Sequence, residues 1–162
     1  MMKYQLFLIV ISILLISCSD TKKSDANQPI TILNEFDDEA VKWFKETGNA
    51  SIKGVAKFKS KSDELRYGEE FRIELMPSCL YTEERLMKIY DSKESGFIYV
   101  EDGVPKFTPD PEGYHDTKKT MCNQAGEFEY NNLPSGDYYL IAFMLWDKTG
   151  GGIMQHVVLS EG

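Results

Sequence analysis

The sequence predicts a mainly β protein, in which residues 50–160 form an antiparallel β-sandwich that follows one short N-terminal helix. Three observations indicate this fold class. Beyond residue 50, apolar side chains recur at every second position, as in strands with one buried face. Clusters of glycine, proline and asparagine separate these runs and predict turns. Residues 137–146, DYYLIAFMLW, are apolar on both faces, which is typical of a central strand covered on both sides.

The chain begins with the pattern of a secretory signal peptide. Lys3 precedes the apolar run 6–16, which is interrupted by one serine. This run is too short for a transmembrane helix, which needs about 20 apolar residues. It ends in LISC at residues 15–18, which resembles the lipoprotein box of bacterial lipoproteins. The resemblance implies that residues 1–17 are a lipoprotein signal peptide and that Cys18 carries fatty-acyl chains such as palmitate. An ordinary signal peptide with an incidental cysteine is the alternative.

Residues 18–33 predict a flexible tether between the lipid and the domain. The stretch 19–29, SDTKKSDANQP, contains no large apolar side chain. In lipoproteins, an aspartate directly after the acylated cysteine favours retention at the inner membrane, but Ser19 occupies that position here. We therefore expect a lipid-anchored protein of the cell envelope, at the outer membrane rather than the inner one.

Size and charge limit the class of protein. Residues 34–162 are enough for one domain with a substantial core. The formal net charge is −8, and because nucleic acids and anionic lipid surfaces repel an acidic protein, neither is expected as a partner.

Two cysteines, Cys79 and Cys122, remain once Cys18 is assigned to the lipid. An exported domain with two thiols usually pairs them, so we expect a disulfide. Closing a loop of about 44 residues would stabilise the fold by about 4 kcal/mol in the chain-entropy model. A reactive thiol or a pair of metal ligands is the alternative, although the sequence has no CxxC motif.

Residues 34–48, NEFDDEAVKWFKETG, predict the N-terminal helix. Its apolar stripe consists of Phe36, Ala40, Val41 and Phe44. Acidic residues near its start, lysines near its end and the terminal glycine are typical helix boundaries. We expect this helix to cover an edge or end of the sheet, with Trp43 packed in the core rather than exposed for recognition.

Two alternating segments, 51–61 and 70–77, predict the first strands, joined by a turn at 66–68. The inward positions are Ile52, Gly54, Ala56 and Phe58 in the first segment and Phe71, Ile73 and Leu75 in the second. The outward positions of the first segment are Lys53, Lys57, Lys59 and Lys61. These lysines protect an exposed edge against pairing with another chain; a row of ligand-binding cations is the alternative.

Residues 80–121 are less regular. They predict a short helix or turn at 82–95 with Leu86 and Ile89 inward, a strand at 96–100, a proline-rich loop at 104–113 and a strand at 114–121. The expected disulfide between Cys79 and Cys122 would link the two ends of this segment.

The segment 126–143, GEFEYNNLPSGDYYLIAF, carries the most specific pattern. Its motif consists of Gly126, Phe128, Tyr130, Leu133, Pro134, Gly136 and Tyr138. This order resembles the carboxypeptidase regulatory-like family of small transthyretin-like (prealbumin-like) β-sandwiches, over about residues 40–159. The resemblance implies a transthyretin-like antiparallel sandwich and no particular activity, since the glycines serve turns and the aromatic residues serve the core. Glycines 150–152 are expected to form the last hairpin before a final strand.

Residues suited to catalysis are sparse. Only His115 and His156 could act as a base for a nucleophile, and no serine lies in a Gly-x-Ser-x-Gly elbow. Weak candidates for a metal site are Asp110, Glu112, His115 and Asp116 in PDPEGYHD. Glu127 and Glu129 could form an acid–base pair, but a solvated strand face is the simpler interpretation. We therefore expect no enzyme, no metal and no cofactor.

These observations favour a noncatalytic, lipid-anchored sandwich that acts as a binding or scaffold module of the cell envelope, with a protein or glycan partner. One alternative is a carbohydrate-binding surface module, in which Tyr67, Tyr81, Tyr99 and Tyr114 would stack on sugar rings. The other alternative is a secretion-system outer-membrane lipoprotein, which only the fold and the anchor support.

Overall fold

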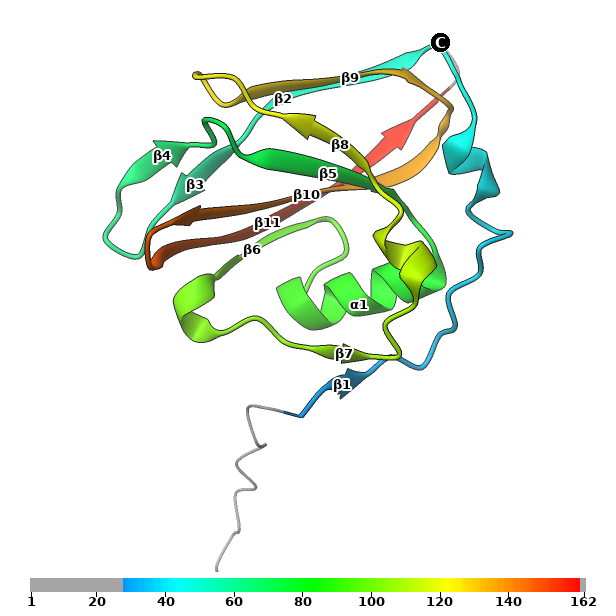
Figure 1. Ribbon diagram of the computed structural model, residues 1–162, viewed down its shortest axis with the longest axis horizontal. Coiled ribbons are helices and arrows are strands. Elements are labelled where there is room, and N and C mark those ends of the chain that lie inside the picture. Colours follow the sequence, from blue (N-terminus) through cyan, green and yellow to red (C-terminus); the bar gives the residue numbers. More distant parts are fainter. Residues whose placement is uncertain (1–27, 161–162) are drawn as a thin grey trace, which may run out of the picture.

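A five-stranded antiparallel sheet organises the molecule (Figure 1). The computed structural model describes residues 28–160. The strand order is β6 (Ser95–Tyr99), β11 (Thr149–Leu159), β10 (Gly136–Trp146), β5 (Arg72–Pro77) and β8 (Lys118–Met121). The expected mainly β, antiparallel sandwich is confirmed.

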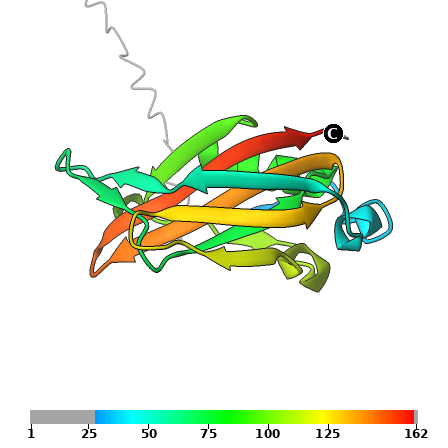
Figure 2. The ribbon, with the colours of Figure 1, turned by 90° about the horizontal axis from the view of Figure 1, so that it is seen from above.

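Different elements cover the two faces of this sheet. On one face lie the antiparallel pair β2 (Ala50–Val55) and β9 (Glu127–Leu133) and the hairpin of β3 (Lys57–Lys59) and β4 (Leu65–Tyr67). Figure 2 shows β2 and β9 lying across the sheet. On the other face lie α1 (Leu80–Tyr90) and the short parallel pair of β1 (Ile30–Thr31) and β7 (Phe107–Thr108). Between residues 28 and 160 the chain also forms the 3₁₀ turns η1 (Lys42–Lys45), η2 (Val100–Asp102) and η3 (Glu112–His115).

Strand β10 separates two hydrophobic cores. Tyr138, Leu140 and Met144 face β2 and β9 in the sandwich core, whereas Tyr139 and Ile141 face α1 in a second core, the helix-side core. Successive side chains of a strand point to opposite faces, so an apolar run on both faces suits a strand between two cores. Residues 137–146 form the expected central strand, which is covered on both faces from Tyr138 to Ala142, whereas Phe143 and Leu145 are exposed.

The two tyrosines of the 126–138 motif form hydrogen bonds that stabilise the sandwich. Tyr130 donates its hydroxyl to the carbonyl of Ile73 at 2.6 Å, from β9 across to β5. Tyr138 donates to the carbonyl of Pro134 at 2.6 Å and so fixes the turn between β9 and β10. Both rings are buried, and their hydroxyls therefore need these partners.

The predicted helix over 34–48 is wrong; the segment contains only the 3₁₀ turn η1. Asp37 Oδ1 accepts the backbone N–H of Glu39 at 2.9 Å, and this local turn competes with helix formation. Val41 and Phe44 are buried as expected, while Ala40 is exposed. Trp43 packs against Tyr138, with ring centroids 5.1 Å apart.

Two predicted turns lie elsewhere. The segment 51–61 is split into β2 and β3 at Ala56, whose N–H donates to the carbonyl of Gly126 and whose carbonyl accepts from the N–H of Gly68. The turn that follows β3 lies at residues 60–64 rather than at the expected 66–68. Glycines 150–152 belong to β11 and not to a turn, which is formed by residues 147–148.

The expected disulfide between Cys79 and Cys122 is absent. Both thiols are free. Cys122 is buried in the sandwich core, whereas Cys79 packs against the helix-side core. Alternation alone could not place the two residues on opposite sides of a sheet.

The predictions for the N-terminal region concern residues on both sides of residue 28, the first residue that the structure describes. The signal peptide 1–17 and the lipidation site Cys18 lie outside the described residues. Within 28–160, no helix is long and apolar enough to span a bilayer. The expected tether boundary at residue 33 lies too late, because β1 begins at Ile30 and Ile32 is buried in the helix-side core.

Candidate functional site

A cleft of about 510 Å³ opens on the helix side of the sheet, and we call it the helix-side cleft. Its floor is formed by β5 and β10, one wall by α1, and the remaining walls by segments 104–107 and 114–121. The volume is in the range of small-molecule sites. The lining combines aromatic side chains with charged ones, including Arg72, Glu74, Arg85, Tyr90 and Phe143.

Phe143 forms an exposed aromatic surface on the cleft floor. It lies on the central strand β10, yet 41% of it is exposed. Its neighbour on β11 is Gly152, and a methyl group added there would lie 2.7 Å from Cε1 of Phe143. The missing side chain at Gly152 therefore makes room for the Phe143 ring.

The hydroxyl of Tyr90 lies beside this ring. The same methyl group at Gly152 would be 2.8 Å from Tyr90 Oη. Tyr90 is 8% exposed, and within residues 28–160 its hydroxyl is the only buried side-chain nitrogen or oxygen without a hydrogen-bond partner. A buried hydroxyl without a hydrogen-bond partner lowers the stability of a fold by about 1–3 kcal/mol.

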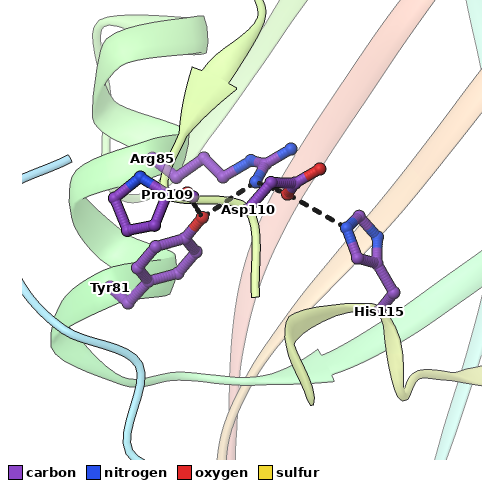
Figure 3. Close-up of polar contacts among 5 residues, drawn as sticks. All are labelled: Tyr81, Arg85, Pro109, Asp110 and His115. Atoms are coloured by element: carbon purple, nitrogen blue, oxygen red, sulfur yellow. Dashed lines mark hydrogen bonds and ion pairs between the residues drawn. The ribbon is translucent and has the colours of Figure 1, made fainter. Parts of the chain in front are cut away.

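Arg85 connects α1 with the loop before η3 (Figure 3). Its Nη1 donates to Tyr81 Oη at 3.0 Å and to Asp110 Oδ1 at 2.5 Å. The hydroxyl of Tyr81 in turn donates to the carbonyl of Pro109 at 2.7 Å. His115 Nε2 lies 3.0 Å from the same oxygen of Asp110. These contacts hold residues 109–115, beside the cleft, against α1.

The guanidinium of Arg85 also stacks on aromatic rings. It lies 4.3 Å from the centroid of Tyr114 and 4.7 Å from that of Phe107, and only 14% of the side chain is exposed. The hydrogen bond from Arg85 lowers the pKa of Asp110, and burial raises the pKa of Tyr114 to about 12. Asp110 is therefore ionised and Tyr114 neutral at pH 7, so the charge of Arg85 is matched within the protein.

A second ion pair lines the cleft between Arg72 and Glu74. Arg72 Nη2 lies 2.8 Å from Glu74 Oε1, and the two side chains are 57% and 28% exposed. Thr117 Oγ1 donates to the other carboxylate oxygen at 3.0 Å. With each arginine paired to a carboxylate, the cleft offers hydrogen-bonding groups without an excess of positive charge.

The weak metal candidates do not converge. Asp110 and His115 contact each other, whereas Asp116 Oδ2 lies 2.7 Å from Lys45 Nζ. Glu112 is exposed. Within residues 28–160, no three His, Cys, Asp or Glu side chains are grouped so as to hold a metal ion.

The residues considered for catalysis are likewise dispersed. His156 packs on Tyr139 with ring centroids 4.9 Å apart, and Glu129 pairs with Lys53 at 3.1 Å. In the described part of the chain, no serine, threonine or cysteine side chain is hydrogen-bonded to His115 or His156. Neither imidazole is thus positioned to activate a nucleophile.

The four tyrosines considered for sugar stacking differ in position. Tyr81 and Tyr114 are buried in the helix-side core, which argues against the alternative in which these two rings stack on a sugar. Tyr99 is half-buried, and Tyr67 is 47% exposed on the β3–β4 hairpin, outside the helix-side cleft. Phe143 could not be singled out from the sequence, because its strand was expected to be covered on both faces. The available signal for its exposure was Gly152, which lies beside Phe143 on the neighbouring strand β11.

A smaller groove of about 360 Å³ lies between the layers of the sandwich. Its lining is mostly apolar and includes Val55, Phe128 and Ile153, with Lys57 as the only charged residue. It therefore offers fewer groups for orienting a polar ligand than the helix-side cleft does.

Comparisons with known proteins support the fold. No protein-family model and no curated protein matches the chain. The structure is similar to a crystal structure from Pseudomonas aeruginosa described as a "putative carbohydrate binding protein", with a TM-score of 0.64 and 21% sequence identity. The match covers 80% of this chain and 92% of the other. At this identity the similarity concerns the fold.

Proposed function

We propose that the protein is a lipid-anchored, noncatalytic binding module of a bacterial cell envelope, and that its helix-side cleft binds a carbohydrate. The proposal depends on one observation above all. The cleft places an exposed aromatic ring, Phe143, in the same cavity as the paired side chains of Arg72 and Glu74.

Such a combination suits an uncharged, polyhydroxylated ligand. The apolar C–H face of a sugar ring can be buried against an aromatic ring, while its hydroxyls can donate to a carboxylate and accept from a guanidinium. The four charged lining residues are Glu70, Arg72, Glu74 and Arg85, whose formal charges cancel. The description of the structural neighbour from Pseudomonas aeruginosa as a carbohydrate-binding protein supports this ligand class.

The anchor would join the domain on the side of the cleft. Strand β1 pairs with β7, whose Phe107 lines the cleft. An acylated Cys18 would precede Ile30 by a stretch that spans at most about 40 Å when extended. The domain would then stay close to the membrane, as expected for a module that binds an envelope glycan.

A saccharide screen tests the binding function. The full chain, purified in detergent, would be examined by saturation-transfer NMR with methyl glycosides of glucose, galactose and mannose, with N-acetylglucosamine and with glucuronate. We expect saturation transfer to at least one neutral sugar and less to glucuronate. If no sugar receives saturation while cross-linking in cells captures a protein partner, the carbohydrate proposal fails and the scaffold interpretation takes its place.

Metabolic labelling tests the anchor separately. Cells that express the chain would be given labelled palmitate, and we expect the label on the wild type and not on Cys18→Ser. An unlabelled wild type would contradict the lipid anchor without touching the carbohydrate proposal.

A further inference from the structure

We propose that Phe143 is the stacking platform for the apolar face of a neutral pyranose ring, and that the Tyr90 hydroxyl beside it binds a hydroxyl of the same sugar. This inference rests on the proposed carbohydrate-binding function and specifies the part of the helix-side cleft that would recognise the ligand.

The first step is the position of Phe143. A residue of a central strand next to α1 would ordinarily be covered, as Tyr139 and Ile141 of the same face are. Phe143 lies beyond the part of the strand that the helix-side core covers. Its ring occupies the space that a side chain at Gly152 of β11 would fill. The ring is thus supported from beneath by the sheet, while a large part of it is exposed in the cleft.

The second step is the chemistry around the ring. Arg72, Glu74 and Thr117 line the same cleft and are joined to one another by ionic and hydrogen bonds. A guanidinium and a carboxylate can contact neighbouring hydroxyls of a sugar, because one donates and the other accepts. A carboxylated sugar would meet Glu70 and Glu74 as well as the arginines, so a neutral pyranose is the better match.

The third step is the Tyr90 hydroxyl. It is buried beside the platform without a partner in the protein. A buried hydroxyl in a native structure normally has a hydrogen-bond partner, and an exception calls for an explanation. A small displacement of the Phe143 ring by a bound sugar would let a ligand hydroxyl reach it and supply the partner.

The test compares dissociation constants of variants of the detergent-solubilised full chain, using the neutral sugar with the strongest saturation transfer. Phe143→Leu removes the ring but stays apolar, and we expect Kd to rise about three- to tenfold. Phe143→Tyr keeps the aromatic ring, and its Kd should stay within about twofold of the wild-type value. Phe97→Ala is the matched control, because Phe97 is 59% exposed and lies outside the helix-side cleft.

Tyr90→Phe separates ligand binding from a structural role. Since the hydroxyl has no partner in the protein, its removal should not lower the melting temperature. We expect Kd to rise about three- to tenfold, the effect of one lost hydrogen bond. A lower melting temperature with unchanged Kd would overturn the assignment of this hydroxyl to the ligand.

The outcomes distinguish this inference from the proposed function. If no neutral sugar binds the wild type, both are wrong. If a sugar binds but Phe143→Leu has no more effect than Phe97→Ala, the carbohydrate function survives and the platform is refuted. A selective loss in Phe143→Leu with recovery in Phe143→Tyr supports the platform.

Discussion

Glu84 and Asn34 are joined by two hydrogen bonds across 50 residues of sequence. The backbone N–H and the side-chain amide of Asn34 both donate to Glu84 Oε2, at 2.9 and 2.8 Å. The N–H of Leu33 donates to the same carboxylate, at 3.0 Å. Glu84 lies on α1, so these contacts fasten the N-terminal segment to the helix that forms a wall of the cleft.

These hydrogen bonds from residues 33–34 to Glu84, which we call the Glu84 clasp, predict that the local stability of the N-terminal segment depends on pH. The hydrogen bonds lower the pKa of Glu84 from its usual 4.5 to about 2, the backbone N–H of Asn34 contributing most. Because the folded-state pKa is depressed, the stabilisation is fully present above pH 4.5 and is lost as the pH falls toward 2. The protection of the amides of residues 30–34 against hydrogen exchange, measured relative to their intrinsic rates at each pH, should therefore fall over this range more than that of the β10 amides does.

Glu84→Gln is the variant that tests the clasp. It should accelerate exchange at residues 30–34 already at pH 7 and weaken its pH dependence. Glu69→Gln, at an exposed position, provides the control. Equal pH profiles for wild type and Glu84→Gln would contradict a stabilising role for the carboxylate.

Tyr130→Phe should destabilise the sandwich by about 1–2 kcal/mol. The substitution keeps the buried ring but removes the donor to the carbonyl of Ile73, leaving that hydrogen bond unmade. Tyr67→Phe removes a hydroxyl from an exposed ring and should change stability by less than about 0.5 kcal/mol. Urea denaturation of both variants measures the difference; equal midpoints would show that the bond contributes nothing.

Arg85→Lys should lower stability by about 1–2 kcal/mol although the charge is kept. A lysine cannot stack its planar group on Tyr114 while donating to both Tyr81 and Asp110. Arg72→Lys, in the more exposed pair with Glu74, should have a smaller effect. Thermal unfolding of the two variants checks the order, and an equal or larger loss for Arg72→Lys would contradict the role given to burial of Arg85.

Cys79 and Cys122 should both be reactive toward an alkylating reagent once the chain is unfolded without a reductant. In the folded protein, Cys122 should react slowly because burial hides it and raises the pKa of its thiol. Mass spectrometry of peptides counts the adducts. A peptide pair linked through the two residues would contradict their placement in separate cores.

The sheet could be predicted because its signals are local. The run 137–146 is apolar on both faces, and its position between two cores buries Tyr138 to Ala142 and Met144. The alternation in 70–77 likewise placed Ile73 and Leu75 in the sandwich core. The short helix or turn expected at 82–95 is the helix α1, which spans Leu80–Tyr90 with Leu86 buried and Ile89 half-buried.

The parts that could not be predicted depend on contacts between distant residues. The 34–48 segment has a helical pattern, but tertiary packing of Val41 and Phe44 and the turn at Asp37 override it. The helix-side cleft combines residues from 70 to 143, and the exposure of Phe143 depends on a glycine in another strand. No sequence period contains that information.

Titration of the isotope-labelled full chain with the best-binding neutral sugar, followed by amide chemical shifts, is the most direct test of carbohydrate binding in the helix-side cleft. We predict that the largest shifts fall on residues 72–76, 85–90 and 141–143, which surround this cleft. Shifts confined to β2 and β9, or no shifts at saturating sugar, would contradict it.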